Sequence, residues 1–591
     1  MRRGCGFASV LRHPHFTPAR NMARPIGPTM YRMNSSNTPA SPALGRVLTT
    51  VSVGFVVTQL DVTIVNIALP RIGSDLHANV AGLQWIVDAY TLAFAVLMLS
   101  AGALGDRFGA RRMYAAGIAV FALASLACGL ALDAPMLIAS RALQGVGAAA
   151  MLPNSLALLN RAYGHDPKLR ARAVGLWTAA GAISIAAGPV AGGLLIAGFG
   201  WRSIFLVNLP ICAAGLLATW LWVPRDDGVA REAGREAGTG ISCGAERGSG
   251  AAGAAGVAGV AGAAGTARAA RAAGAAVAAA AIGTSKASSA TKAAASTKTP
   301  SSATTTRPAS RGIDLGGQCL AIVALTAFVA AVIEWRPLGP GHPLVAGGLV
   351  LALLAASAFI AVESRVASPM LPLSLFSKRT FSAAVLFGIC VNLTYYGMVF
   401  VLSLYLQRAR GYSPLQAGLA FLPLTGGFLV SNVASGWAVG RFGVRVPMIV
   451  GAVIAALGYG LLHRVDATTP LIGLLLPFLL IPSGMGLAVP AMTTAVLAST
   501  DARRAGTASA VLNTARQAGG AVGVAAFGAL ASGAAAAQIV SGMQAATAVS
   551  VGLLLLGAVL GCVVHPQPHA PAAGPDATAP TDSRSADRSQ G

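Results

Sequence analysis

Charged side chains are scarce in this sequence. Only 10% of its 591 residues are Asp, Glu, Lys or Arg, whereas soluble domains carry about 25%. Apolar residues make up 55%, so the composition excludes an ordinary soluble domain and predicts an integral membrane protein. The formal net charge is +23, but the basic residues lie in loops and tails. We therefore expect no nucleic-acid partner, which would need a basic surface.

Sequence motifs of enzymes and metal sites are also missing. The chain has no G-x-x-x-x-G-K-[ST], H-E-x-x-H or G-x-S-x-G pattern, so we predict no enzyme, no cofactor and no ATP site. Energy for any transport would then come from an ion gradient or from the gradient of the substrate. The seven cysteines form no C-x-x-C pair, and neither a disulfide framework nor a metal site is expected; they are Cys5, Cys128, Cys212, Cys243, Cys319, Cys390 and Cys562.

Long apolar runs are what the chain has in abundance. Fourteen are long enough to cross a bilayer, which takes about 20 residues. They lie near 44-69, 83-104, 113-132, 135-160, 171-198, 204-223, 313-334, 344-363, 381-406, 414-438, 446-463, 470-499, 505-534 and 545-564. An even number places both termini on one side. With the basic N-terminus in the cytoplasm, the short inner loops carry 14 Lys and Arg residues and the outer loops carry 6, as the positive-inside rule requires.

Polar, low-complexity segments divide the chain. We expect a disordered cytoplasmic tail at 1-43 with no cleaved signal peptide, a disordered Ala/Gly/Ser-rich cytoplasmic linker at 224-312 and a disordered cytoplasmic tail at 565-591. The apolar runs between them form a first six-helix half at 44-223, two inserted helices at 313-363 and a second six-helix half at 381-564. The true start of translation stays open.

A short charged loop, GALGDRFGARR, lies between two apolar runs at 102-112. Its arginines mark the cytoplasmic side, and its acid can cap a helix or hold an arginine. The related segment GWAVGRFGVR at 436-445 has Gly440 in place of the acid, which indicates a repeat of the hairpin in the second half. The residues of interest in the first loop are Gly102, Asp106, Arg107, Gly109, Arg111 and Arg112.

Three charged residues are predicted to lie inside the membrane in the first half. Asp61 is about 12 Å from the outer end of its span and Arg141 about 9 Å into another, at 1.5 Å per residue. Such groups are costly unless they are paired, protonated or face a cavity. Asp61 is either a proton or cation site or a structural acid, and Gln144 shares a face with Arg141. Asp88 is a second candidate acid, or it is solvated at the headgroup level. Because all three residues are expected in the outer half of the membrane, one of the two acids is the natural partner of Arg141.

Two further spans carry unusual residues. In the fifth, small residues favour close helix packing and a proline favours a kink, although a kinked helix without a special role has the same pattern; the residues are Gly175, Ser184, Gly188, Pro189, Gly192 and Gly193. In the thirteenth, Arg516 is either a structural counter-ion or a contact for a substrate anion.

These motifs together resemble transporters of the major facilitator superfamily, and in particular the EmrB/QacA-type drug:proton antiporters with fourteen transmembrane helices. The matching segments are the 102-112 loop, LDVTIVNIALP at 60-70, the antiporter pattern at 175-193 with Ser184 in place of a usual glycine, WRSIFLVNLP at 201-210 and NTARQAGG at 513-520. The resemblance implies an all-α polytopic fold of two six-helix halves plus two inserted helices. It also implies a conformational latch at Asp106 and its arginines.

The function expected from this resemblance is proton-coupled multidrug efflux by alternating access. The exported compounds would be hydrophobic and cationic or amphipathic. Alternatives are export of an endogenous metabolite or natural product, import by a transporter of the same type, and a membrane receptor or scaffold that transports nothing. The expected partners are a small-molecule substrate, protons and the lipid bilayer of the cell (inner) membrane, with a periplasmic adaptor if the host has an outer membrane.

Overall fold

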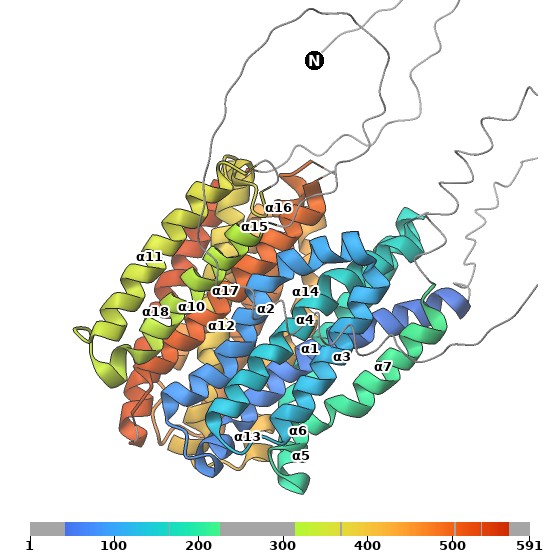
Figure 1. Cartoon of the computed structure of the whole chain (residues 1–591). Helices are drawn as coiled ribbons and strands as arrows, with labels where there is room; N and C mark the ends of the chain where they lie inside the picture. Colours follow the sequence, from blue (N-terminus) through green and yellow to red (C-terminus); the bar gives the residue numbers. More distant parts are fainter. Residues whose placement is uncertain are drawn as a thin grey trace, which may run out of the picture.

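The computed structural model describes residues 42–164, 166–224, 314–366, 369–501, 504–533 and 535–565. Within these ranges every regular element is a helix (Figure 1). The predicted linker and both predicted tails lie outside the described residues, apart from a few residues at their edges. Cys5, Cys243 and Arg503 lie outside them as well. The five cysteines in the described part of the chain are free.

The first group of helices comes before the undescribed linker region. It consists of α1 (Pro42–Asp75), α2 (Val80–Phe108), α3 (Ala110–Gly129), α4 (Ala134–Tyr163), α5 (Pro167–Phe199), α6 (Ser203–Leu206) and α7 (Asn208–Trp222). We call this set the N-terminal group. Two helices follow, α10 (Leu315–Leu338) and α11 (Pro343–Glu363). The C-terminal group is α12 (Arg379–Leu404), α13 (Pro414–Ala420), α14 (Leu422–Phe442), α15 (Arg445–Leu462), α16 (Leu471–Ala498), α17 (Ala505–Leu530) and α18 (Ala536–Val563).

Thirteen helices in the described part of the chain are long and apolar enough to cross a membrane, where consecutive short helices count as one span. The remaining predicted span, 505-534, is present as helix α17 but is not among the thirteen. Its centre contains Asn513, Thr514, Arg516 and Gln517, which lower its apolar character. The protein is thus a multi-pass membrane protein, and a crossing by α17 stays a prediction.

Local sequence explains where several of these helices begin and end. The side chain of Asn79 accepts a hydrogen bond from the backbone at the start of α2, and Asp133 does the same for α4. Such caps satisfy backbone groups that the first turn leaves unpaired. Gly109 ends α2 with φ of 96°, a conformation that glycine adopts without steric cost. The charged loop can therefore turn sharply between α2 and α3.

Two of the predicted spans are interrupted. The sixth consists of α6 and α7, which meet at Val207, and the tenth consists of α13 and α14, which meet at Phe421. Both breaks lie near the end of the bundle where α6 and α13 are labelled in Figure 1. We call this the Asn79 end, and the opposite end the Gly109 end.

The two groups pack against each other along a few helix pairs. Helix α2 contacts α17, α1 contacts α12, and α5 contacts α13 and α14. The hydrogen bonds that join the groups among the described residues concentrate at the Asn79 end and at mid-depth. Gln84 of α2 donates to the carbonyls of Val524 at 3.1 Å and Ala525 at 2.6 Å in α17. Thr425 of α14 donates to the carbonyl of Ala186 at 3.2 Å.

Helices α10 and α11 lie along the outside of the bundle (Figure 1), where α10 packs on α2 and α17. Gln318 of α10 anchors this contact: its amide donates to the carbonyl of Val96 at 2.9 Å, and its oxygen accepts a hydrogen bond from Ser100. Side chains of α11 such as Leu344 and Leu353 point away from the protein, as expected for a helix that faces lipid.

Candidate functional site

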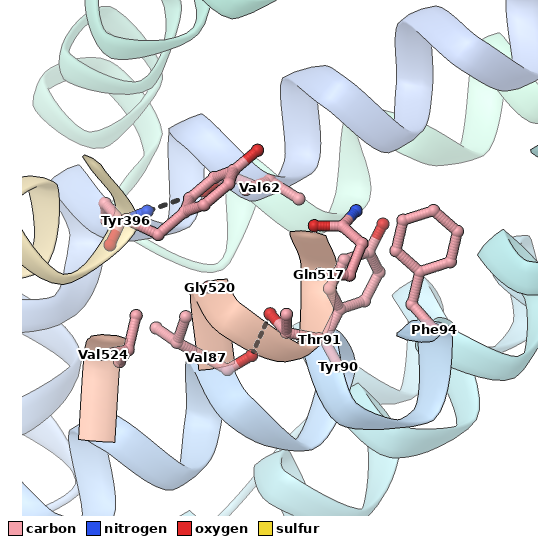
Figure 2. A pocket seen from close by; sticks show the side chains of 10 residues that line it. Val62, Val87, Tyr90, Thr91, Phe94, Tyr396, Gln517, Gly520 and Val524 are labelled. Atoms are coloured by element: carbon pink, nitrogen blue, oxygen red, sulfur yellow. Dashed lines mark hydrogen bonds between the residues drawn. The ribbon is translucent and has the colours of Figure 1, made fainter. Parts of the chain in front are cut away.

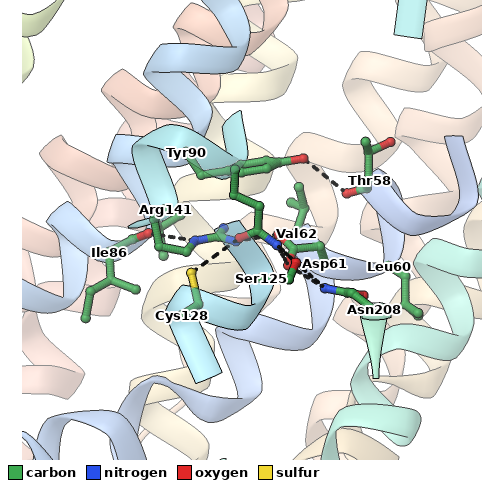
Figure 3. Close-up of polar contacts among 12 residues, drawn as sticks. Thr58, Leu60, Asp61, Val62, Ile86, Tyr90, Ser125, Cys128, Arg141 and Asn208 are labelled. Atoms are coloured by element: carbon green, nitrogen blue, oxygen red, sulfur yellow. Dashed lines mark hydrogen bonds and ion pairs between the residues drawn. The ribbon is translucent and has the colours of Figure 1, made fainter. Parts of the chain in front are cut away.

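A buried ion pair joins α1 to α4. Arg141 Nη1 lies 2.5 Å from Asp61 Oδ2, and each side chain is 1% exposed (Figure 3). Of the two acids predicted as partners for Arg141, Asp61 is therefore the one that the structure places there. A pair of this kind inside a membrane protein marks a candidate functional site, because an isolated charge at such a position would be costly.

Neutral polar side chains complete the surroundings of Asp61. Gln144 Nε2 donates to Asp61 Oδ1 at 2.9 Å, and Arg141 Nη1 donates to Gln144 Oε1 at 2.6 Å. Asn208 of α7 donates to Asp61 Oδ1 at 3.4 Å, and Ser125 of α3 accepts from Gln144 at 2.8 Å. Asp61 is thus held directly by residues of α4 and α7. Ser125 of α3 supports it indirectly, through its hydrogen bond with Gln144. In the sequence, Asn208 stands out only as part of the segment at 201-210, and no pattern marks Ser125.

Arg141 is enclosed on its remaining sides. Its Nε donates to the carbonyl of Ile86 at 3.2 Å, and its guanidinium carbon lies 4.3 Å from the ring centre of Tyr90 (Figure 3). Cation–π contact of this kind stabilises a desolvated arginine. Small residues let α4 approach its neighbours here, since a Cβ atom on Gly147 would lie 2.7 Å from the backbone nitrogen of Phe121.

Asp88 is a second buried acid, one that the structure leaves without a partner. Its exposed fraction is 0%, and neither carboxyl oxygen has a hydrogen bond. Tyr90 is also buried, at 1% exposed. The alternative of a solvated Asp88 near the headgroups is therefore wrong for this structure, because the side chain is fully buried.

A small cavity of about 10 Å³ lies where α1, α2, α12 and α17 meet. This volume has room for about one water molecule. Its lining combines aromatic, aliphatic and neutral polar side chains (Figure 2): Val62, Asn66, Val87, Tyr90, Thr91, Phe94, Tyr396, Gln517, Gly520 and Val524. Tyr90 is common to this cavity and to the surroundings of Arg141, so the ion pair and the cavity are neighbours.

Residues 51–524 match the sequence model of the Major Facilitator Superfamily. The chain belongs to this superfamily. Because members of this family are transporters, the protein is a transporter and not an enzyme. The described residues contain no group of three or more His, Cys, Asp and Glu side chains that could hold a metal ion.

Individual relatives agree with the family assignment. The chain is 33% identical over 507 residues to the methylenomycin A resistance protein of Streptomyces coelicolor, covering 85% of this chain and 90% of that one. It is 33% identical over 473 residues to the multidrug resistance protein Stp of Mycobacterium tuberculosis, covering 79% and 72%. A bacterial homologue of the human lysosomal transporter Spinster, solved in an inward-facing and unoccupied conformation, shares the fold with a TM-score of 0.53 and 15% identity, over 89% of this chain and 98% of that one.

The charged loop of this superfamily member lies at the Gly109 end. Asp106 and Arg107 are exposed, and Asp106 makes no ion pair within the described residues. Arg111 is partly buried and donates to the carbonyl of Trp220 at 3.0 Å, which ties the start of α3 to the end of α7. Gly102 is partly buried, and Arg112 is exposed. The structure therefore does not join Asp106 to the arginines of its own loop.

The small residues of the antiporter pattern in α5 contact two different helices, α1 and α13. A Cβ atom on Gly188 would lie 2.8 Å from Cβ of Thr63 in α1, and one on Gly193 would lie 2.8 Å from Cα of Leu415 in α13. Gly192 has ordinary contact distances to α1, and nothing lies within 4 Å of a Cβ on Gly175. Ser184 is buried, and its hydroxyl donates to its own helix at 2.8 Å. Close packing thus occurs around Pro189 but not at Gly175.

Arg516 lies near the middle of α17, in the C-terminal group. Its Nε donates to Oδ1 of Asn392 in α12 at 3.4 Å. The helix contact around it is close, since a Cβ atom on Gly388 would lie 3.2 Å from Cγ of Arg516. Two residues that line the cavity, Gln517 and Gly520, are on the same helix.

Proposed function

We propose that the protein is a proton-coupled efflux transporter that exports hydrophobic or amphipathic small molecules by alternating access. The observation that carries this proposal is the buried Asp61–Arg141 pair beside a cavity lined by helices of both groups. The names of the relatives support the direction, since resistance proteins of the same superfamily protect cells from toxic compounds. Efflux of drugs or antibiotics is therefore the function that we assign to this chain.

In this proposal Asp61 is the carboxyl that binds the exchanged proton. Protonation would remove its negative charge and weaken its bond to Arg141. Arg141 and Gln144 would then rearrange, and the helices α1 and α4 that carry them could move. Asp88 is the candidate for a second proton site, because a buried carboxyl without partners is most stable in its neutral form.

Alternating access requires two discrete packings of the groups. The hydrogen bonds between α2 and α17 at the Asn79 end are consistent with a state that is closed at that end. Asp106 and its arginines would close the Gly109 end in the opposite state, which agrees with the unpaired, exposed Asp106 of this one. We further propose that the termini and the Gly109 end are cytoplasmic, in the cell or inner membrane.

We also propose the domain organisation and the partners that the sequence predicts. The N-terminal and C-terminal groups would be the six-helix halves, with α10 and α11 as the inserted pair. Protons and a lipid bilayer would be partners, as would a periplasmic adaptor in a host with an outer membrane.

A natural product made by the host is the second candidate cargo. The similarity to a methylenomycin A resistance protein from Streptomyces coelicolor favours it, because the name of that protein refers to resistance against one antibiotic rather than many. Metabolite profiles of the growth medium would distinguish the cases. Loss of one extracellular compound in a deletion strain supports this candidate, and an unchanged profile with altered drug susceptibility contradicts it.

The function is tested with a deletion strain and a panel of structurally different antibiotics. We expect greater susceptibility to hydrophobic aromatic compounds, restored resistance on complementation, and equal accumulation in both strains once a protonophore removes the gradient. Complementation with Asp61→Asn should fail although the variant reaches the membrane. Unchanged susceptibility and accumulation across the panel would contradict drug efflux.

A further inference from the structure

Arg516 is a cation inside the C-terminal group with no carboxylate to balance it. Among the described residues its hydrogen bond goes to the neutral Asn392, at the long distance of 3.4 Å. The guanidinium has five N–H donors, so most of its donors remain free. An arginine in such a position is costly unless something pairs with it.

No acid among the described residues forms an ion pair with Arg516, and this includes Glu334 of α10 and Glu363 of α11. The described residues of the C-terminal group contain only Asp466 and Asp501 as acids, and both lie in loops between helices. In the N-terminal group, Asp61 is already paired with Arg141. Asp88 accepts no hydrogen bond from any side chain, so it does not compensate Arg516 either.

The cavity beside Arg516 is consequently neutral or positive in character. Arg516 precedes Gln517 directly and is one helical turn from Gly520, which both line the cavity. Gly520 in turn packs against Tyr396, whose ring forms part of the lining (Figure 2): a Cβ atom on Gly520 would lie 2.9 Å from Cδ2 of Tyr396. None of the lining residues carries a formal charge. The nearest charged pair, Asp61 with Arg141, sums to zero.

The neutral side chains of the lining suit an aromatic molecule that carries oxygen groups. Tyr90, Phe94 and Tyr396 offer ring surfaces, against which flat apolar molecules stack. Oδ1 of Asn66 is buried and accepts no hydrogen bond, so it can accept one from a hydroxyl group of a ligand. In the present state the cavity holds about 10 Å³, and a ligand enters only when the lining helices separate.

We propose that the transporter selects aromatic compounds bearing a carboxylate or another oxyanion, with Arg516 as the residue that binds the anion. The inference rests on the proposed export function and defines its substrate class. Guanidinium and carboxylate form paired, charge-assisted hydrogen bonds. A cationic compound would meet Arg516 without a free carboxylate in the lining, so it is disfavoured. This differs from the cationic cargo expected from the sequence.

Three probes that share one ring system and differ in charge test the proposal. They are 1-pyrenebutanoic acid, its methyl ester and 1-pyrenebutylamine, and their fluorescence reports binding to the purified full-length protein in nanodiscs. We expect the acid to bind about tenfold or more tightly than the amine, since hydrogen bonds between charged groups contribute at least that factor. Arg516→Gln should remove this preference and leave the affinity for the ester within about twofold.

Two further variants separate binding from structure. Arg516→Lys keeps the charge without the paired geometry and should have an intermediate preference for the acid; it also serves if Arg516→Gln does not fold. Arg441→Gln removes an exposed arginine at the end of α14 and should leave all three affinities unchanged.

The inference is overturned if the amine binds as tightly as the acid, or if Arg516→Gln weakens acid and ester equally, which would make Arg516 a structural contact of α12. Uptake of the same probes into proteoliposomes tests the substrate class separately from the proposed export function. Transport of the amine in preference to the acid contradicts the substrate class alone. Failure to bind or move any of the three, by folded wild-type protein, counts against both the substrate class and the proposed function.

Discussion

At the scale of single residues, Asp61 is held by more than its arginine. Gln144 and Asn208 donate to the same carboxylate, so the loss of Arg141 would leave the acid partly satisfied. Arg141 has fewer alternatives, because its other contacts are a backbone carbonyl and the ring of Tyr90. The two partners are therefore not equivalent.

This asymmetry predicts the stability of variants at the pair. Removing one partner of a buried ion pair costs roughly 3–5 kcal/mol, and we expect Asp61→Asn to cost more than Arg141→Gln. The double variant should be less destabilised than the sum of the two, since it leaves no unpaired charge. Thermal unfolding in detergent measures all three, with Asp501→Asn in an exposed loop as a control of no effect. Additive losses would show that the two side chains do not interact.

The pair itself was partly predictable. Its charges stand out in apolar spans, and their depths, counted at 1.5 Å per residue, place them at similar levels. The sequence could not decide between Asp61 and Asp88 as the partner, because that depends on how α1 and α2 rotate about their axes. It also could not place Ser125 and Asn208, which are ordinary residues until the helices pack.

At the scale of elements, α5 packs against both groups through its small residues. Gly188 faces α1, and Gly193 faces the start of α13. The sequence predicts the close packing and the proline, but it cannot tell which neighbour each glycine meets. It likewise missed the breaks at Val207 and Phe421, because an apolar run gives no signal of interrupted backbone hydrogen bonds.

Two glycines of α5 provide a matched pair of variants. Gly193→Ala would place a methyl group against the backbone of Leu415, and such overpacking costs about 1–3 kcal/mol. Gly175→Ala has open space and should stabilise the helix by about 0.5–1 kcal/mol. Thermal unfolding and transport assays should both separate the two variants. Equal behaviour would mean that α5 and α13 do not pack as described.

At the scale of the whole molecule, the contacts between the groups are uneven along the bundle. Gln84 joins α2 to α17 at the Asn79 end, while the charged loop at the other end exposes Asp106. The helical repeat and the loop motif predict the fold class from sequence. Which end is closed depends on small energy differences between two packings of the same helices, which no sequence pattern expresses.

The proposed latch predicts a shift between these packings. Spin labels at Phe108 and Gly440, both exposed near the Gly109 end, report the separation of the groups in a background whose seven native cysteines are replaced. Asp106→Asn should move the distribution toward longer distances, because it weakens only the state that is closed at this end. An unchanged distribution, with unchanged transport, would remove Asp106 from the conformational cycle.

The central claim is proton exchange through Asp61, and proteoliposomes with an imposed pH gradient test it most directly. A pH-sensitive dye reports proton flux while the fluorescence of the best transported pyrene probe reports substrate flux. We predict that wild-type protein moves the two in opposite directions, and that Asp61→Asn still binds the probe but moves no protons with it. Gradient-driven transport at the wild-type rate by Asp61→Asn would contradict the account.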